Sequence, residues 1–347
     1  MTPDLVALSR TQGDVFSGPQ ALACGITRNE LRRWLDHRTI VALRRGIFTM
    51  ATMLDGADKR RRHELDVAAA LLVRDPDQRW PGTLDPGTRL AAGHSSAALL
   101  WGIDAEDPPI LRPRPGRSSP AVDPETLERQ RIVQLVSADR CRRTYRWGVE
   151  VRPSSLPPEH LTALGVLPIT TMARTAIDLA RECTWVWAVI AVDSAMRLGT
   201  TRGELTDMAG FCAQWRGGIQ AMRAAEFARK EAQSAAESFA RALFQQHGLP
   251  EPEIQFDIRD ENGEWVARVD LLFRAQRTAV ETDGKIKYSE PWGDPRETLW
   301  KEKLREDRIR DCQYEVVRVT WQQLMTDPEG VIARVRRAFA RAARLAV

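Results

Sequence analysis

The sequence is poor in the features that mark secreted, zinc-ribbon and membrane proteins. Its five cysteines are scattered over 347 residues and form no C-x-x-C pair, which argues against a zinc ribbon and a disulfide framework. No apolar run reaches the ~18 residues of a membrane helix. The N-terminus carries Asp4 and lacks the basic start and apolar core of a signal peptide. We therefore expect a cytoplasmic protein with no membrane partner.

The composition is that of a folded protein with several domains. Hydrophobic residues make up 43% and charged residues 28%, which excludes a disordered chain, and 347 residues are enough for two or three cores. The net charge of +4 and the sequence pI of about 8.9 permit nucleic-acid binding without proving it.

The first 55 residues are predicted to form a winged helix, with three short helices and a hairpin in residues 1–50. Ser17-Gly-Pro-Gln20 and Thr27-Arg-Asn-Glu30 both have the form of a capping box, and Gly25 separates the two helices that they open. The run Val41–Thr49 reads as two strands joined near Arg45-Gly46. This order of two capped helices and a hairpin, the wing, is typical of DNA-binding domains.

The second of these helices and the wing are basic. Arginine and asparagine can donate hydrogen bonds to phosphates and to base edges. The alternative is a solvated basic helix face with no ligand. The candidate DNA-binding residues are Arg28, Asn29, Arg32, Arg33, Arg44 and Arg45.

Residues 56–182 are expected to form a mixed α/β middle domain and residues 183–230 a helical spacer. Helices are predicted at 61–73, 93–101 and 168–181, the last capped by Thr170 or Thr171, and strands at 132–135 and 149–151. His94 lies beside Ser95-Ser96 and is interpreted as a capping or packing residue, not a catalytic one. No acid cluster or metal-ligand spacing is visible in the spacer.

The last domain, residues 231–347, contains a helix followed by three predicted strands. The helix opens at Ser234 and ends before Gly248; the strands are expected at 253–259, 264–274 and 277–283, with a type I′ turn at Asn262-Gly263. If Ala275-Gln276 is the second turn, Leu272 faces Ala279 and Asp270 faces Glu281. Further along, a charged helix (297–311), a strand (314–320) and a closing helix (328–345) are predicted.

Side chains alternate along a strand, so this register predicts that Asp270, Glu281 and Asp283 converge on one face. Facing like charges destabilise a sheet unless a cation compensates them. Oxygen ligands suit Mg²⁺ or Mn²⁺, which can activate water and neutralise charge on a phosphate. The alternative is a polar sheet face whose acids pair with nearby Arg and Lys.

Glu237 and the basic residues after the strand at 277–283 complete the predicted site. Glu237 is either the third residue of a capping box, an extra acid for metal or water, or both. Lys285 or Lys287, after the strand-breaking Gly284, could stabilise the transition state. Lys303 or Arg308 in the charged helix could contact substrate phosphate.

These pieces together resemble known families. Residues 234–339, through Glu237, Arg268-Val-Asp-Leu271 and Val280-Glu-Thr-Asp-Gly-Lys-Ile-Lys-Tyr288, resemble PD-(D/E)XK endonuclease-like domains of the very-short-patch-repair type found in actinobacteria. The N-terminal segment, with Leu43-Arg-Arg-Gly-Ile-Phe48, resembles the winged helix of AbiEi-type antitoxins of toxin–antitoxin systems.

The resemblance implies that Asp270 and Glu281 are metal ligands and that Glu237 is an auxiliary acid. One position departs from the motif, because Asp283 stands where a lysine is expected. The lysine must then come from elsewhere, with Lys285 the first choice and Lys287 or Lys303 the next.

The sequence as a whole predicts an α/β (α+β) protein with a winged helix, a mixed α/β and helical middle region, and a C-terminal restriction-endonuclease-like domain. The expected function is a magnesium-dependent DNA endonuclease, a hydrolase with Glu237, Asp270, Glu281, Asp283 and Lys285 in its site. The alternative is a non-enzymatic DNA-binding regulator or antitoxin with a toxin protein as a possible partner.

Overall fold

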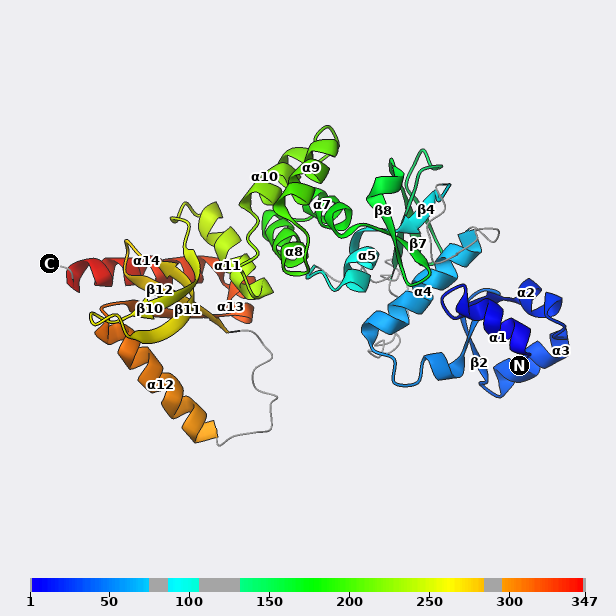
Figure 1. Cartoon of the computed structure of the whole chain (residues 1–347), viewed down its shortest axis with the longest axis horizontal. Helices are drawn as coiled ribbons and strands as arrows, with labels where there is room; N and C mark the ends of the chain where they lie inside the picture. The colour runs from blue at the N-terminus through cyan, green and yellow to red at the C-terminus, as the bar shows by residue number, and fades with distance from the viewer. Residues whose placement is uncertain (1, 75–86, 106–131, 284–294, 346–347) are drawn as a thin grey trace, which may run out of the picture. The chain divides into compact units, whose positions relative to one another are not determined.

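The structure is a computed structural model that describes residues 2–74, 87–105, 132–283 and 295–345. The chain divides into two compact units, Met1–Leu179 and Ala180–Val347. Both units combine helices with β-sheets, so the predicted α/β class is confirmed (Figure 1). None of the helices in this described part has both the length and the apolar character that crossing a bilayer requires.

The first unit begins with the three short helices and the hairpin that were expected. A strand that was not predicted, β1, joins the hairpin to make a three-stranded antiparallel sheet with β3 at its centre. Leu5, Phe16, Ile26, Ile40 and Phe48 form its core. The elements are α1 (Pro3–Arg10), β1 (Val15–Ser17), α2 (Gly18–Ala23), α3 (Arg28–Asp36), β2 (Ile40–Arg44), β3 (Ile47–Met50) and the short helix η1 (Ala51–Met53).

Both predicted capping boxes are present. The Ser17 hydroxyl accepts a hydrogen bond from the Gln20 N–H at 3.3 Å, and the Gln20 side chain accepts one from the Ser17 N–H at 2.8 Å. Thr27 and Glu30 make the same reciprocal pair at the start of α3. The predicted turn between β2 and β3 is also present, with Gly46 at φ +76°. The local signals therefore predicted these elements correctly.

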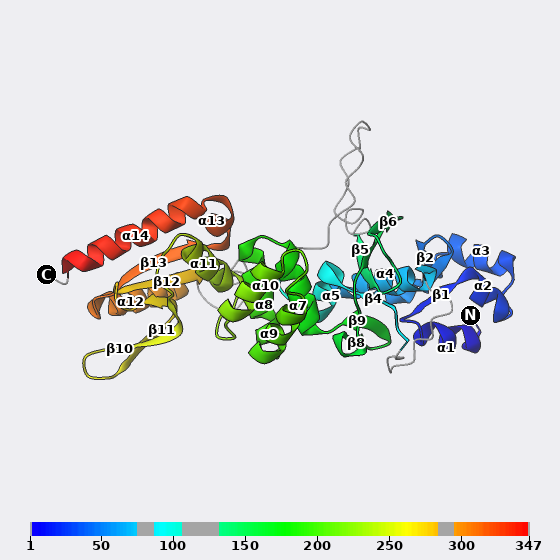
Figure 2. The same ribbon diagram turned by 90° about the horizontal axis from the view of Figure 1, so that it is seen from above.

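The rest of the first unit is built on a six-stranded mixed sheet in the order β6-β7-β5-β4-β9-β8. Figure 2 shows it from β6 at one edge to β8 at the other. The predicted strands at 132–135 and 149–151 are β5 and β7, which pair in parallel. The strands are β4 (Leu90–Ala92), β5 (Val133–Ser137), β6 (Thr144–Arg146), β7 (Val149–Pro153), β8 (Leu161–Leu164) and β9 (Leu167–Thr170), with a short helix η2 (Pro158–His160) before β8.

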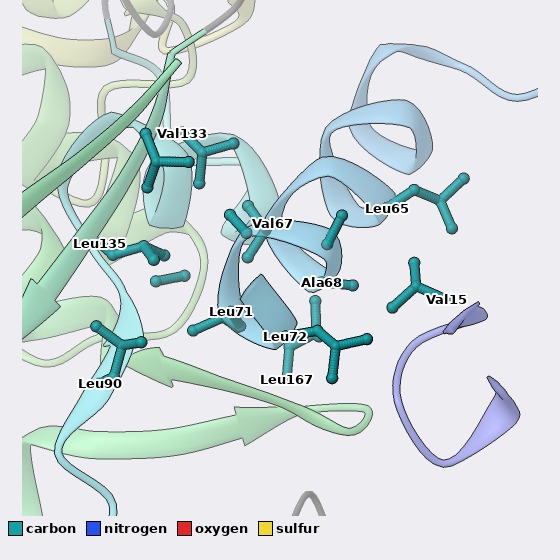
Figure 3. Close-up of a cluster of buried hydrophobic side chains, with 14 of the residues drawn as sticks. Val15, Leu65, Val67, Ala68, Leu71, Leu72, Leu90, Val133, Leu135 and Leu167 are labelled. Carbon is teal, nitrogen blue, oxygen red and sulfur yellow. The ribbon is translucent and has the colours of Figure 1, made fainter. Parts of the chain in front are cut away.

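Helix α4 (Lys59–Arg74) packs against both sheets of the first unit. All residues from Val67 to Leu72 are buried, which is wider than the one-sided stripe of a surface helix. They share one core cluster with Val15 of the small sheet and with Val133 and Leu167 of the large sheet (Figure 3). Helix α5 (His94–Trp101) also packs into it. The expected boundary near residue 55 is therefore not a break in packing.

Helix α7 (Met172–Glu182) begins later than predicted. A helix was expected from Pro168, but Leu167–Thr170 is strand β9, in which every residue is buried. A fully buried strand lacks the alternation that would distinguish it from a helix in the sequence. Of the two expected caps, Thr171 accepts a hydrogen bond from the Arg174 N–H at 3.3 Å. The prediction was therefore wrong for the first turn of this helix.

Helix α8, in the segment expected as a spacer, is part of the core of the second unit. Ile190 of α8 is buried in one cluster with Phe239 of α11 and Val331 of α14. Asp193 of α8 and Arg241 of α11 are both fully buried and form a 2.7 Å salt bridge. Packing therefore joins α8 to the C-terminal domain. The helices of the expected spacer are α8 (Trp185–Arg197), α9 (Arg202–Phe211) and α10 (Gly218–Phe227), and α11 (Ala235–Gln246) is the helix predicted to open at Ser234.

A four-stranded mixed sheet in the order β10-β11-β12-β13 lies between helices of the second unit (Figure 1). Leu271 and Val280 pack under α11 and α14, whereas Leu272 and Ala279 pack with Ile309 of α12 on the other face. Only β12 and β13 are parallel to each other. The elements are β10 (Glu253–Arg259), β11 (Trp265–Phe273), β12 (Thr278–Asp283), α12 (Pro295–Asp311), β13 (Glu315–Thr320), α13 (Trp321–Thr326) and α14 (Pro328–Leu345).

The turn between β10 and β11 is not the predicted two-residue type I′ turn. That type needs a positive φ at both central residues, and of Asn262 and Gly263 only Gly263 has one, at +83°. Instead, the Asp260 carboxylate accepts hydrogen bonds from the N–H groups of Asn262 and Glu264, both at 2.9 Å. The pairing register shifts between Ile258 and Arg259 at the end of β10, so the turn is longer than two residues and is accompanied by a β-bulge.

Candidate functional site

Strands β11 and β12 have the pairing register that was predicted by counting from the turn. Leu272 lies opposite Ala279, and the next pair towards the candidate site is Leu271 with Val280. The Arg277 N–H donates to the Arg274 carbonyl at 3.0 Å, which closes a turn with Ala275 and Gln276 at its centre, as predicted. Asp270 and Glu281, the two acids that were predicted to face each other, are the next residues along the strands after this last regular pair.

The carboxylate of Asp270 lies on the α11 side of the sheet. Its Oδ2 accepts hydrogen bonds from the backbone N–H of Thr282 at 2.8 Å and from the Thr282 hydroxyl at 2.9 Å. Its Oδ1 accepts one from the Gln255 side-chain amide at 3.2 Å, and the same amide donates to Oε2 of Glu237 at 3.0 Å. Glu237 and Asp270 therefore form a pair of carboxylates bridged by one amide, which we call the acid pair.

The carboxylate of Glu281 lies on the α12 side of the sheet. Its Oε1 is 2.7 Å from Nη1 of Arg305, and its Oε2 is 3.8 Å from Nη2 of Arg318. Two arginines thus compensate the charge of a residue that is only 8% exposed. The prediction that Asp270, Glu281 and Asp283 converge on one face is therefore wrong.

The cause is a change of face in β10 and β11. In a regular strand Val269 and Leu271 would share a face, but Val269 packs in the α12 cluster and Leu271 in the α11 cluster. Strand β10 changes face at the same place, where Gln255 has a φ of +51°. This left-handed residue lies opposite Asp270 in the pairing register and brings both side chains to the α11 side.

Glu237 is buried, with 3% of its surface exposed. Burial raises its pKa, and the neighbouring charge of Asp270 adds to this, whereas hydrogen bonds from Gln233, Gln255 and Ser234 oppose it. Ser234 accepts from the Glu237 N–H at 3.2 Å and donates to its Oε1 at 2.9 Å. The capping role and the role as an extra acid, both considered for Glu237, are thus compatible.

The other predicted members of the site are not gathered around the acid pair. Asp283 is exposed at the end of β12, level with Thr320 of β13. Lys285 and Lys287 lie outside the described residues, and Lys303 is exposed on α12. In the described ranges, no three His, Cys, Asp or Glu side chains are grouped as metal ligands. The structure therefore brings two carboxylates together, Glu237 and Asp270, in place of the expected three.

Gln255 and Thr282 are the members of this site that sequence reasoning missed. Both are polar residues inside a strand. Gln255 lies between Ile254 and Phe256, and Thr282 lies between the acids Glu281 and Asp283. A polar residue between two apolar ones was the only available signal for Gln255. Its left-handed conformation, which decides where Asp270 points, has no sequence signature in a residue that is neither Gly nor Asn.

The basic residues predicted on α3 are exposed. Partly buried Leu31, Trp34 and Leu35 pack this helix onto the small core, which leaves its polar face turned outward. The exposed candidates are Arg28, Asn29, Arg32 and Arg33 on the helix and Arg45 in the turn of the wing. The fold therefore leaves this part of the predicted DNA-binding set accessible.

Arg44 is the exception in that set. Its Nη1 donates to the Trp147 carbonyl at 2.8 Å and its Nε to the Asp66 carbonyl at 3.4 Å. Burial lowers the pKa of Arg44, and burial raises the pKa of the neighbouring Asp66 to about 6. The predicted position of Arg44 at the wing tip is corrected: it ties β2 to the hairpin formed by β6 and β7.

A buried polar network in the large sheet was not predicted. Glu150 accepts hydrogen bonds from Gln134 at 2.8 Å, from Arg152 at 3.2 Å and from Arg143. Arg152 also contacts Nδ1 of His94 at 3.3 Å. His94 is buried in this network, which agrees with the packing role expected for it.

Comparison with known proteins finds relatives over part of the chain. No family model matches the sequence. Two uncharacterized proteins of Mycobacterium tuberculosis, from strains CDC 1551 and H37Rv, are each 30% identical over 175 residues, which is 50% of this chain. The aligned region spans 62% of the length of these curated relatives.

Proposed function

We propose that this chain is a DNA-binding protein whose second unit hydrolyses phosphodiester bonds with a divalent metal ion held by Glu237 and Asp270. The observation that carries this proposal is the acid pair itself. Glu237, which is 3% exposed, and Asp270 both accept a hydrogen bond from the Gln255 amide, and their negative charges repel each other. A cation would remove this repulsion.

The described donors fit such an ion. Mg²⁺ keeps several waters in proteins and takes only one or two carboxylates together with substrate phosphates. Oδ1 of Asp270 accepts one hydrogen bond, from Gln255, and a carboxylate oxygen has room for a second partner. When bound, the ion would supply an activated water and neutralise charge on the scissile phosphate.

The surrounding residues would hold the acids in position. Thr282 fixes Oδ2 of Asp270 with two hydrogen bonds, and Gln255 fixes the spacing between the two carboxylates. Hydrogen bonds from the Gln233 N–H and the Gln255 amide hold Oε2 of Glu237 in place. Glu281 and Asp283 are left out of the ligand set, because Glu281 is already compensated by arginines on the opposite face.

Targeting to DNA is assigned to α3 and the turn of the wing. Arg28, Arg32 and Arg33 lie exposed on one short helix with capped ends, and their guanidinium groups can bind phosphates and guanine edges. Arg45 adds a further cation in the turn of the wing. Arg44 is excluded from this interface because its donors are used inside the unit.

A second candidate is a non-enzymatic DNA-binding regulator, with a toxin protein as its possible partner. The pairing of Glu281 with Arg305 and Arg318 favours it, because arginines take the place of the cation that a third acid would need. In this reading the acid pair is structural and the second unit is a binding surface. The exposed basic face of α3 serves both candidates equally.

Calorimetric titration of Mn²⁺ separates the two candidates. We expect wild type to bind Mn²⁺ and to cleave plasmid or single-stranded DNA, and Asp270→Asn and Glu237→Gln to lose both. The matched control is Glu253→Gln, which removes an exposed acid from the same sheet that pairs with Arg274. Absence of metal binding in wild type would overturn the nuclease and leave the regulator.

A further inference from the structure

The segment that leads into β6, β6 itself and the start of its turn into β7 are exposed and rich in arginine and aromatic residues. From Asp139 to Trp147 every residue is exposed except Thr144, which is half-buried. Tyr145 is 49% exposed and Trp147 is 62% exposed. The segment carries four arginines, Arg140, Arg142, Arg143 and Arg146, of which only Arg143 forms a salt bridge to another described residue.

The turn of this hairpin holds a tryptophan in a conformation that disfavours it. Trp147 has φ +53° and Gly148 has φ +72°. Two successive positive φ values are typical of a type I′ turn, where Asn-Gly is the favoured sequence and a bulky residue is strained. The indole is not placed there for burial, and Arg146 lies over its ring at 4.1 Å. Strain of this kind is found at binding sites more than elsewhere.

Positive charge gathers behind the same turn. Arg74, at the end of α4, has its pKa lowered by burial and by the nearby charges of Arg140 and Arg146. Its Nη2 is shielded from solvent and has no hydrogen-bond partner in the part of the chain that the structure describes. The nearby acid Glu150 is already engaged by Arg143 and Arg152. The cluster therefore lacks its own counter-charge within these residues and suits a polyanion.

This cluster is continuous with the wing. Arg44, the last residue of β2, donates to the carbonyl of Trp147 at 2.8 Å, which joins the turn of the wing to the turn of the β6–β7 hairpin. A duplex bound at α3 and Arg45 would thus meet a second basic element next to the wing.

We propose that the β6–β7 turn is a second contact with duplex DNA, in which Arg140, Arg142 and Arg146 bind backbone phosphates beside the wing and Trp147 packs against the sugar edge. This proposal rests on DNA binding by α3. Arginine binds phosphate oxygens through a planar fork, and an exposed aromatic face next to cations is suited to nucleotides. Two adjacent elements would lengthen the contact along one DNA backbone.

The test compares two hairpin variants with wild type on a fluorescent mixed-sequence duplex over a range of salt concentrations. Arg142→Gln with Arg146→Gln should weaken binding and lower the salt slope by about 0.9 for each phosphate that is no longer bound. Trp147→Asn should also weaken binding, and because it creates the favoured Asn-Gly turn it should keep the fold. Circular dichroism and thermal unfolding would verify that both variants fold.

The matched control is Arg60→Gln with Arg10→Gln, which removes two exposed arginines of the same unit. Arg60 lies in the first turn of α4 whereas Arg74 ends the helix, about 20 Å away along its axis. An unchanged slope in Arg142→Gln with Arg146→Gln, unchanged affinity in Trp147→Asn, or an equal loss of affinity in the control would overturn the hairpin contact. Tighter binding of wild type to RNA than to DNA, abolished in the hairpin variants, would overturn its assignment to duplex DNA.

The same titration separates this inference from the proposed function. Arg32→Ala with Arg33→Ala should weaken binding through α3. If the α3 variant weakens binding but the hairpin variants do not, only the hairpin contact fails. If the α3 variant binds as wild type does, targeting by α3 fails, and the hairpin as a second contact fails with it.

Discussion

Thr282 holds the carboxylate of Asp270 through two hydrogen bonds to the same oxygen, one from its backbone N–H at 2.8 Å and one from its hydroxyl at 2.9 Å. Only the hydroxyl can be removed by substitution. Thr282→Val keeps the β-branched shape that suits a strand but deletes this donor.

If Asp270 is a metal ligand, Thr282→Val should lower Mn²⁺ affinity about tenfold or more, the range typical of residues that orient a ligand. Thr282→Ser should restore affinity close to that of wild type, because it returns the hydroxyl. Calorimetry on the three proteins measures this difference. Equal affinity for the Val and Ser variants would remove the hydroxyl from the proposed site.

The pKa of Asp66, raised by burial to about 6, predicts a pH dependence of stability in the first unit. Because the folded carboxyl binds its proton more tightly than the unfolded one, protonation favours folding. The stability contributed by this group should therefore decline as the pH rises from about 4 to about 6, and stay low above that.

Asp66→Asn should remove this decline. The variant should match wild type near pH 4 and be more stable above pH 6, by about 3 kcal/mol. Denaturant unfolding at several pH values, followed through the first unit, would measure the difference. A wild type whose stability does not fall between pH 4 and 6 relative to the variant would contradict the assigned burial of Asp66.

Whether the position of a site residue could be predicted depends on the physical feature that determines that position. Counting from the turn placed Leu272 opposite Ala279 correctly, because pairing register follows from turn position. The side on which Asp270 lies depends instead on the left-handed backbone of Gln255, a tertiary effect that alternation cannot anticipate. The pairing of Glu281 with Arg305 comes from α12 crossing that face, an interaction between residues distant in the sequence.

The same distinction holds in the first unit. The capping boxes of Ser17 and Thr27 could be predicted from the sequence, because their hydrogen-bond partners lie only three residues away. The hydrogen bond of Arg44 to the Trp147 carbonyl could not be predicted in this way, because the two residues are 103 positions apart in the sequence. Local chemistry is readable from the chain, whereas packing between remote elements is not.

The salt bridge between Asp193 and Arg241 is fully buried, so the loss of one partner should be severe. Asp193→Ala would leave an uncompensated guanidinium in the core and should lower the free energy of unfolding by roughly 3–5 kcal/mol. Asp193→Ala with Arg241→Met should be destabilised less, because no buried charge remains. Denaturant unfolding of the second-unit transition checks both values.

An exposed pair in the same unit provides the control. Arg274 and Glu253 form a bidentate salt bridge on the surface of the sheet. Glu253→Gln should change stability by less than about 1 kcal/mol, because exposed pairs contribute little. If Asp193→Ala and Glu253→Gln are destabilised by the same amount, burial is not what makes the Asp193–Arg241 pair important.

The exposed cations of α3 predict a salt-dependent interaction with DNA. Arg32→Ala with Arg33→Ala should weaken binding and lower the salt slope by about 0.9 for each phosphate left without its arginine. Fluorescence anisotropy at several salt concentrations measures both quantities, with Arg10→Gln, on α1, as a control. A slope equal to that of wild type would mean that α3 presents a solvated basic face and not a DNA-binding one.

Glu281 offers the sharpest contrast with Asp270, because the two acids occupy neighbouring positions of paired strands yet have different partners. Asp270 is held by neutral donors, Thr282 and Gln255, whereas Glu281 is matched by the charges of Arg305 and Arg318. Glu281→Gln should therefore lower the free energy of unfolding by about 1–3 kcal/mol, since it removes the charged carboxylate that both arginines contact. It should leave Mn²⁺ affinity unchanged. Loss of Mn²⁺ binding in folded Glu281→Gln would instead make Glu281 a ligand, as the family resemblance implies, and would require its carboxylate to exchange the arginines for the ion.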